Sequence, residues 1–175
     1  MKIVFDLDGV LRNTMRYLNE RYGVPKPTSW EWLYKDKDIF HYAKLNNYAM
    51  VREAKPTKLV AVLNKYIECP EIWTHQPWEW MHHTKEWLGE HIGNCTVKIL
   101  KPEEKREELD GAKDTILVDD YPAFKNYRRV ALVRHLYNSH VKGMYNIKTV
   151  GDFEKLLIEV GGCKERKAHE EHRVV

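Results

Sequence analysis

Short apolar stretches alternate along the chain with longer segments of helical spacing. Four of these stretches end at a polar residue or a turn signal: Lys2–Phe5, Glu71–Trp73, Thr96–Leu100 and Thr115–Val118. A fifth and weaker stretch is Val130–Val133. Short β-rich runs that alternate with helices are typical of a parallel sheet covered on both faces. The pattern therefore predicts an α/β fold.

The segments beside these stretches carry start and stop signals for helices. Thr57 is suited to cap a helix, Pro102 to stand in a first turn, and Gly93 to end one. We expect four helices: from Thr57 to Tyr66, from Pro77 to about His91, from Glu103 to Leu109 and from Phe153 to Val160.

About fifty residues separate the first apolar stretch from Thr57, and most of them have helical character. A segment of this length and regularity is too structured to be a loop. Helices are expected at Thr14–Tyr22, Ser29–Lys35 and Ile39–Ala54, with a break at Gly23–Pro27. We predict a core domain over residues 1–13 and 57–163, a small helical insertion at 14–56, and a charged tail at 164–175 that frays.

Composition narrows the class of protein. The chain has 175 residues, of which 43% are apolar and 31% charged, as is usual for a soluble globular domain. The net charge of +3 is too small to indicate nucleic-acid binding, so no stable nucleic-acid complex is expected. Asp6 interrupts the first apolar stretch, so we expect neither a signal peptide nor a membrane span. Three cysteines without a CxxC pair favour reduced thiols in a cytoplasmic protein.

Carboxylates follow the first and the fourth predicted strands. The first strand ends in Asp6-Leu7-Asp8-Gly9, and the fourth ends in Asp119-Asp120. Because ligands bind beyond the carboxyl ends of parallel strands, the four carboxylates are expected to converge there. Without a cation such a cluster repels itself, and clustered carboxylate oxygens suit Mg²⁺, which often bridges to a phosphate.

Each position at these strand ends has a role in phosphoryl transfer. Asp6 is suited to attack phosphorus, and Asp8 to protonate the leaving oxygen and then to activate water. Gly9 permits a tight turn that brings backbone N–H groups near the phosphoryl oxygens. Thr74, after the second strand, offers a hydrogen bond to the phosphate, and a lysine near the third strand end neutralises charge. Their joint occurrence in this order predicts a phosphoryl-transfer site.

These residues match, in order, the four motifs of a known family. Asp6-Leu7-Asp8-Gly9-Val10-Leu11, Thr74, a lysine and Asp119-Asp120 resemble those of the haloacid dehalogenase superfamily of phosphohydrolases. The resemblance implies a Rossmann-like sheet, bound magnesium, a phospho-aspartate intermediate and a cap, for which the insertion at 14–56 stands in the right place. It also implies that Asp6, the backbone carbonyl of Asp8 and Asp120 are metal ligands, with Asp119 beside them.

Within that superfamily the chain is most similar to the 5′-deoxyribonucleotidase group. The similarity lies in five segments and in the neighbourhood of Asn138; the segments are Tyr17–Gly23, Thr28–Trp32, Glu86–His91, Leu117–Pro122 and Asp152–Leu156. It implies hydrolysis of a small phosphorylated substrate, most favourably a (deoxy)nucleoside monophosphate. The alternatives are a phosphatase acting on nucleic-acid 3′ ends or on another small phosphometabolite, and a non-catalytic module that binds nucleotide or protein. Asp6 and Asp8 argue against the last.

The catalytic lysine is open between two positions. Lys101 precedes Pro102 at a helix start, which suits the general superfamily pattern and resembles the spacing in polynucleotide 3′-phosphatases. Lys105 is nearer to the position that nucleotidases use. We favour Lys101. A further departure is His75, which follows Thr74 where the nucleotidase group usually has a small residue.

Several other side chains are candidates for substrate contact. Trp30 is the favoured aromatic for stacking on a base, although a tryptophan at helical spacing more often packs in a core. Arg12 is expected near the cleft, either touching substrate or acting in a hinge, and Gly9 and His75 border the same place. Five further histidines match no ligand spacing, and surface or packing roles are favoured for them: His82, His83, His91, His169 and His172.

Overall fold

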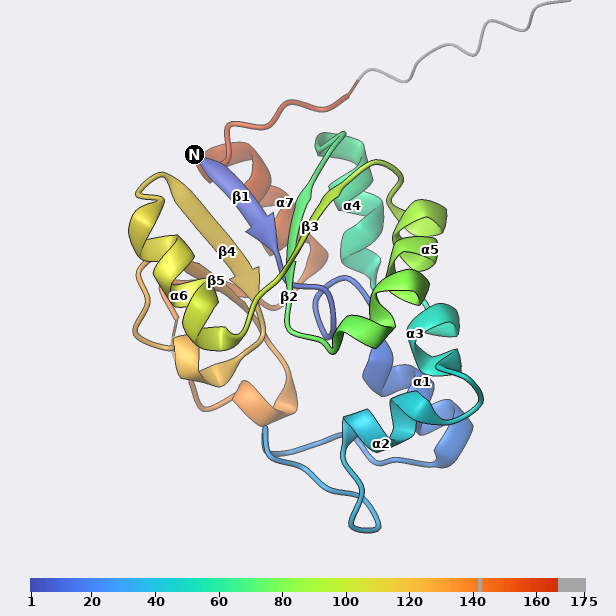
Figure 1. Ribbon diagram of the computed structural model, residues 1–175. Helices are drawn as coiled ribbons and strands as arrows, with labels where there is room; N and C mark the ends of the chain where they lie inside the picture. Colours follow the sequence, from blue (N-terminus) through green and yellow to red (C-terminus); the bar gives the residue numbers. More distant parts are fainter. Residues whose placement is uncertain (142, 167–175) are drawn as a thin grey trace, which may run out of the picture.

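The computed structural model describes residues 1–141 and 143–166 and contains a six-stranded sheet (Figure 1). All neighbouring strands are parallel, in the order β3-β2-β1-β4-β5-β6. The strands are β1 (Lys2–Phe5), β2 (Glu71–Thr74), β3 (Thr96–Ile99), β4 (Thr115–Asp119), β5 (Val130–Val133) and β6 (Tyr145–Ile147). The predicted α/β class with a parallel, Rossmann-like sheet is confirmed, and β6 is a strand that the apolar pattern did not reveal.

The four helices predicted around the sheet are present. They are α4 (Lys58–Tyr66), α5 (Met81–His91), α6 (Pro102–Gly111) and α7 (Val150–Lys155), the last continued by a π-helical turn at Leu156–Val160. Thr57 caps α4 by accepting the Leu59 N–H, as predicted. Short 3₁₀ turns are η1 (Trp78–Trp80), η2 (Pro122–Phe124) and η3 (Leu136–Asn138).

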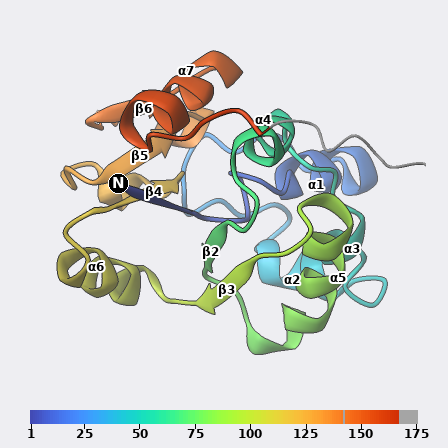
Figure 2. The same ribbon diagram turned by 90° about the horizontal axis from the view of Figure 1, so that it is seen from above.

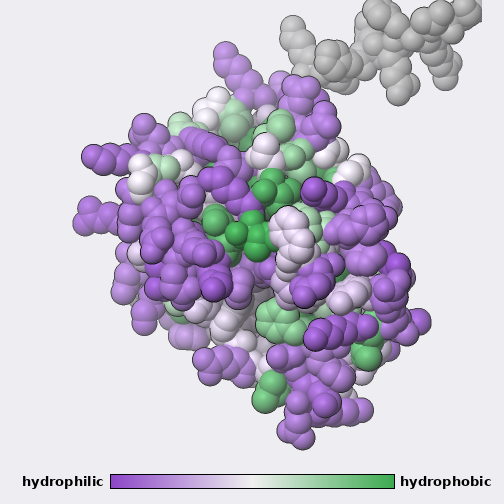
Figure 3. Space-filling model, viewed as in Figure 1, coloured by the Kyte–Doolittle hydropathy of each residue, from purple (hydrophilic) through white to green (hydrophobic). Residues whose placement is uncertain are grey.

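Helices cover both faces of the sheet. Successive side chains of a strand point to opposite faces, so an apolar strand presents apolar side chains on both. Ile3 and Phe5 of β1 pack with apolar residues of α4, α5 and α7 on one face. Val4 of β1 packs on the other face with Leu109 of α6 and Phe124 of η2. Figure 2 shows α4 and α7 on one side of the sheet and α6 on the other. Figure 3 shows that the face seen in Figure 1 is mostly hydrophilic, with apolar side chains surfacing near its centre.

The order of the strands places a reversal between β1 and β4. From β1 the chain builds outward to β2 and β3, and it then returns to add β4 on the other side of β1. Phe5 pairs with Val118, so the residues that follow, Asp6 and Asp119, stand at the same level at the ends of β1 and β4. In open parallel sheets a ligand site is expected at such a reversal, beyond the carboxyl ends of the strands.

The insertion lies beyond those strand ends (Figure 1), and its buried apolar residues form a cluster with Trp80 of η1. It contains α1 (Thr14–Tyr22), α2 (Ile39–Lys44) and α3 (Ala49–Glu53). Two expectations for it were wrong. The segment 29–35 is not helical, and the helix expected over Ile39–Ala54 is divided. The division follows from a turn in which Asn46, Asn47 and Tyr48 all have positive φ, a conformation that α-helices do not contain.

Across the described ranges, up to 141 and from 143 to 166, no helix combines the length and the apolarity needed to cross a membrane. Most of the predicted charged tail, including His169 and His172, lies outside the described residues.

Candidate active site

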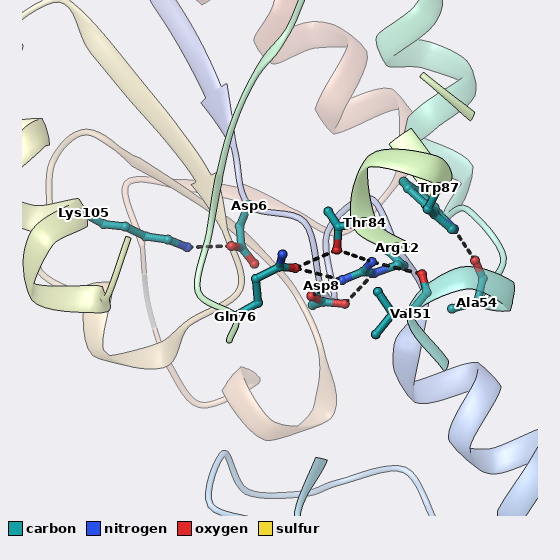
Figure 4. Close-up of polar contacts among 9 residues, drawn as sticks. All are labelled: Asp6, Asp8, Arg12, Val51, Ala54, Gln76, Thr84, Trp87 and Lys105. Carbon is teal, nitrogen blue, oxygen red and sulfur yellow. Dashed lines mark hydrogen bonds and ion pairs between the residues drawn. The ribbon is translucent and has the colours of Figure 1, made fainter. Parts of the chain in front are cut away.

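Lys105 joins two carboxylates at the reversal between β1 and β4. Its Nζ lies 2.6 Å from Oδ1 of Asp6 and 2.8 Å from Oδ2 of Asp119, and all three side chains are buried (Figure 4 shows the pair with Asp6). The alternation of side chains along β1 and β4 explains why Asp6 and Asp119 both face Lys105. Val4 and Leu117 face α6, so Asp6 and Asp119, two residues further along, are directed to the side from which Lys105 reaches.

The expectation that Lys101 is the site lysine is corrected to Lys105. Lys101 stands just before α6 and is exposed, and its backbone N–H donates to Glu104 as part of the helix start. Lys105 lies one turn into α6, where side chains point back toward the helix N-terminus. That direction leads to the strand ends, which is why the later lysine reaches the carboxylates.

Asp120 is held by residues from the segment that follows β5. The hydroxyl of Tyr137 donates a hydrogen bond to Oδ2 of Asp120. Asn138 donates through Nδ2 to the backbone oxygens of Asp120 and Val133, at 2.8 Å each. His135 stacks on Tyr137 with ring centroids 5.0 Å apart. The second carboxylate of the Asp119-Asp120 pair is therefore fixed by β5 and η3, and not by α6.

Gly9 is required by close packing against Asp120. Its φ of 82° lies in the left-handed region. A Cβ at this position would stand 2.0 Å from Oδ2 of Asp120. The turn after β1 thus brings its backbone close to the carboxylate of Asp120, just after β4, as the glycine in Asp-Leu-Asp-Gly predicted for a tight turn.

The negative charge of the buried carboxylates is only partly balanced by positive charge within the protein. Burial, together with the charges of Asp119 and Asp8, raises the pKa of Asp6 to about 7 even though Lys105 opposes the shift. Burial and the charges of Asp119 and Asp6 raise the pKa of Asp120. Burial opposes charging of Lys105, but the charges of Asp119 and Asp6 outweigh it and raise the pKa of Lys105. One ammonium group therefore faces three carboxylates in a buried place.

The site has the composition that a divalent cation requires. Asp6, Asp119 and Asp120 each offer a carboxylate oxygen, and these oxygens lie within 4.8 Å of one another. Lys105 occupies one oxygen each of Asp6 and Asp119, and Tyr137 occupies one oxygen of Asp120. The second oxygen of Asp119 accepts the backbone N–H of Tyr121 at 2.8 Å, so one oxygen each of Asp6 and Asp120 remains available as a ligand. Oxygen-only ligand sets with raised carboxyl pKa values fit Mg²⁺. Of the predicted ligands, Asp6 and Asp120 therefore have carboxylate oxygens in positions suited to a divalent cation.

Thr74 ends β2 at the same edge of the sheet. Its side chain is buried, and Oγ1 has no hydrogen-bond partner among the described residues. A buried hydroxyl without a partner is costly unless a ligand or water completes it. The neighbouring His75 is exposed, and burial of part of its ring, together with Lys105, lowers its pKa. Both residues line the cavity described next.

A cavity of about 550 Å³ lies between the strand ends and the insertion. Asp6, Asp8 and Lys105 stand on its core side, and aromatic and acidic residues of the insertion stand opposite. Trp30 of the insertion is 44% exposed, and its ring lies 4.9 Å from that of Tyr121 and 5.5 Å from that of Tyr137, both in the core.

Asp8 and Arg12 form a pair beside the cavity (Figure 4). Arg12 binds both carboxylate oxygens of Asp8, and its side chain has no exposed surface. Direct contact between Arg12 and a substrate, which the sequence suggested as one possibility, is therefore not what the structure provides. Asp8 itself keeps partial exposure and lines the cavity.

No protein-family model matches the chain, and no curated protein matches it significantly in sequence. The assignment of function depends for this reason on the residues and on their geometry.

The structure also brings together side chains that the sequence analysis did not connect. His82 and His83, which matched no ligand spacing in the sequence, both lie near Glu86 of α5, at 3.3 Å and 3.2 Å. Tyr137 and His135 were not foreseen at the site, and only the similarity around Asn138 pointed to this segment. Gln76 and Thr84, which contact Arg12, carried no signal in the sequence.

Proposed function

We propose that this protein is a magnesium-dependent phosphatase of the haloacid dehalogenase type, which hydrolyses phosphate monoesters through an aspartyl-phosphate at Asp6. The observation that carries the proposal is the convergence of Asp6, Asp119 and Asp120 at the β1–β4 reversal, with Lys105 bound to Asp6 at 2.6 Å. A purely structural cluster would not need three buried carboxylates around one lysine, because burying unpaired charge is costly.

The reaction uses two proton transfers and one covalent intermediate. An oxygen of Asp6 forms a bond to phosphorus while the bond from phosphorus to the leaving oxygen breaks. Asp8, in its protonated form, gives its proton to that oxygen, and the substrate leaves as an alcohol. Water then attacks phosphorus and gives a proton to Asp8, and the bond between phosphorus and Asp6 breaks. Inorganic phosphate is released, and both aspartates return to their initial states.

The remaining residues stabilise charge on the phosphoryl group. Lys105 is placed to neutralise charge that develops on its oxygens, and Thr74 has a free hydroxyl to donate to one of them. Asp6, Asp120 and the backbone carbonyl of Asp8 would hold Mg²⁺, with Asp119 beside them. When bound, the ion supplies positive charge that offsets both the carboxylates and the phosphate.

A nucleoside monophosphate is the substrate class that the cavity supports best. The cavity is about 550 Å³ in volume, within the range of small-molecule sites. Trp30 lines the cavity beside Tyr121 and Tyr137 and offers an aromatic surface on which a base can stack. A (deoxy)nucleoside monophosphate therefore fits the cavity by size and by the presence of an aromatic wall.

Phosphatase action on nucleic-acid 3′ ends is less well supported. Among the described residues, Lys105 is the only lysine or arginine that lines the cavity, while the insertion adds Glu31 and Asp38. An oligonucleotide brings further phosphates, and proteins bind these with additional lysines and arginines. The charge of the cavity wall therefore favours a substrate with one phosphate.

The test is phosphate release from a panel of nucleoside monophosphates, sugar phosphates and 3′-phosphorylated oligonucleotides, with and without Mg²⁺. We expect release that requires Mg²⁺, is fastest with nucleoside monophosphates and is abolished in Asp6→Asn. Binding of nucleotide without release would instead identify a non-catalytic module. Folded protein that releases phosphate from none of these compounds would refute the catalytic proposal.

A further inference from the structure

Arg12 binds Asp8 through two parallel hydrogen bonds. Its Nε donates to Oδ1 at 2.8 Å, and its Nη2 donates to Oδ2 at 2.7 Å (Figure 4). The Arg12 side chain has no exposed surface, whereas the Asp8 side chain keeps 19% of its surface exposed. A paired arrangement of this kind fixes the orientation of a carboxylate as well as balancing its charge.

The other donors of Arg12 anchor it in three further parts of the molecule. Nη1 donates to the backbone oxygen of Val51 in α3 at 3.1 Å and to Oγ1 of Thr84 in α5 at 3.2 Å. Nη2 also reaches Oε1 of Gln76, after β2, at 3.5 Å. All five N–H groups of the guanidinium are thus engaged. The guanidinium cannot turn without breaking several of these contacts, so it is a rigid support.

The strongest hydrogen bonds of Arg12 are those to the residue that lines the cavity. A buried arginine carries a large desolvation cost, and an apolar side chain of similar volume would often serve the fold as well. Here the two best hydrogen bonds of Arg12 are directed at the one partner that lines the cavity, Asp8. The same guanidinium lies 5.8 Å from the ring centroid of Trp87, whose Nε1 is bound to the backbone oxygen of Ala54 at 2.6 Å. Arg12 is therefore held firmly on the side away from the cavity.

We infer that Arg12 is a positioning residue that keeps the carboxyl group of Asp8 oriented toward the leaving oxygen, without touching substrate itself. The inference rests on the proposed function, in which Asp8 gives a proton to the leaving oxygen and later takes one from water. Both transfers require a carboxyl oxygen within hydrogen-bond distance of the reacting oxygen. Without Arg12, rotation of the Asp8 side chain reduces the fraction of time spent in that position.

Substrates with different leaving groups can distinguish a positioning role of Arg12 from a merely structural one. A nucleoside is a poor leaving group and needs a proton, so the value of kcat/KM with a nucleoside monophosphate depends on Asp8. 4-Nitrophenolate leaves without a proton, so kcat/KM with 4-nitrophenyl phosphate does not depend on it. A general loss of folded structure lowers both values by the same factor.

The experiment compares Arg12→Met with the wild type on both substrates in the presence of Mg²⁺. We expect kcat/KM with the nucleoside monophosphate to fall about 100-fold, and with 4-nitrophenyl phosphate less than about threefold. Asp8→Asn should show the same selectivity, and adding Arg12→Met to it should cause little further loss, since the two residues act through one group. A burst of 4-nitrophenolate is expected in Arg12→Met because hydrolysis of the aspartyl-phosphate also needs Asp8.

Two further variants control for folding. Leu63→Ala removes a buried side chain of α4 that does not line the cavity, so it should lower the melting temperature and leave the ratio of the two kcat/KM values unchanged. Arg12→Lys keeps the charge and loses the paired geometry, so it should show the same selective loss if Arg12→Met does not fold.

Equal losses on both substrates in the folded Arg12 variants would overturn the inference and leave the proposed function intact. A wild-type protein that releases phosphate from neither substrate would overturn the proposed function, and the inference with it.

Discussion

The ammonium group of Lys105 lies 2.6 Å from Oδ1 of Asp6, a contact between residues 99 positions apart. The contact joins the end of β1 to the first turns of α6, and it brings the only lysine of the cavity wall, within the described residues, to the proposed nucleophile. Lys105 also binds Asp119. It therefore holds together the two strand ends that flank the reversal of the sheet.

The two candidate lysines give a matched pair of variants. Lys105→Met should lower kcat/KM by about 10²- to 10³-fold, because it removes the cation beside the reacting group. Lys101→Met should have an activity close to that of the wild type, because Lys101 is exposed and does not line the cavity. Phosphate release and circular dichroism measured on both variants test this. Comparable losses in the two would contradict the assignment of Lys105.

Gly9→Ala should damage the magnesium site. The added Cβ would stand 2.0 Å from Oδ2 of Asp120, so the carboxylate must move. Gly23→Ala is the control, because Gly23 also has positive φ but nothing lies within 4 Å of its Cβ position. We expect weaker Mg²⁺ binding by titration calorimetry only in Gly9→Ala, with backbone strain of about 1 kcal/mol in both. Equal Mg²⁺ affinity in the two variants would show that the contact with Asp120 is unimportant.

The stability of the metal-free protein should depend on pH through Asp6. Its pKa is raised from 3.8 to about 7 in the folded protein, mainly by burial. Between these values the folded state binds more protons than the unfolded state, so the free energy of unfolding falls as pH rises through this range. Mg²⁺ binds the ionised form and should offset the loss.

The measurement is the melting temperature with and without Mg²⁺ at several pH values. The increase caused by Mg²⁺ should be larger above pH 7 than near pH 5, since the carboxylates must be ionised to bind the ion. Asp120→Asn should reduce the increase. An increase that is the same at all pH values, or unchanged in Asp120→Asn, would argue against metal binding by these carboxylates.

Trp30→Ala should weaken binding of nucleotides without affecting the chemical step on small esters. Loss of base stacking is expected to raise KM for a nucleoside monophosphate about tenfold, which corresponds to about 1.4 kcal/mol. The kinetic constants with methyl phosphate should not change. Trp78→Ala is the control, because Trp78 is 74% exposed and does not line the cavity. Equal changes with both substrates would mean that Trp30 supports the cavity and does not bind the base.

Much of the fold was predictable because the strands β1, β2, β4 and β5 are largely buried and read as short apolar runs. β6 was missed because Tyr145–Ile147 has only three residues, with a polar one in the middle. The segment 29–35 has the composition of a helix but packs as a loop, with Trp32 against the insertion and Trp30 against Tyr121. The conformation of such a segment is determined by the tertiary contacts of single aromatic residues. These contacts cannot be inferred from the local sequence.

The clustering of carboxylates at the strand ends was predictable to a similar degree. Asp6 and the Asp119-Asp120 pair followed from their position after strands, because parallel strands bring their ends together. The choice between Lys101 and Lys105 depended on the direction in which a helical side chain points, and the spacing of motifs does not give that direction. The support of Asp8 by Arg12 joins β1 to α3 and α5, so it became visible only in three dimensions.

The central claim is that Asp6 carries the phosphoryl group. Asp8→Asn should slow hydrolysis of the intermediate while 4-nitrophenyl phosphate still reacts, so that the intermediate accumulates. After an acid quench and digestion, mass spectrometry of this variant should find one phosphoryl group on the peptide that contains Asp6, and none when Mg²⁺ is omitted. A phosphoryl group on any other residue, or continued turnover with no phosphorylated peptide, would contradict the account.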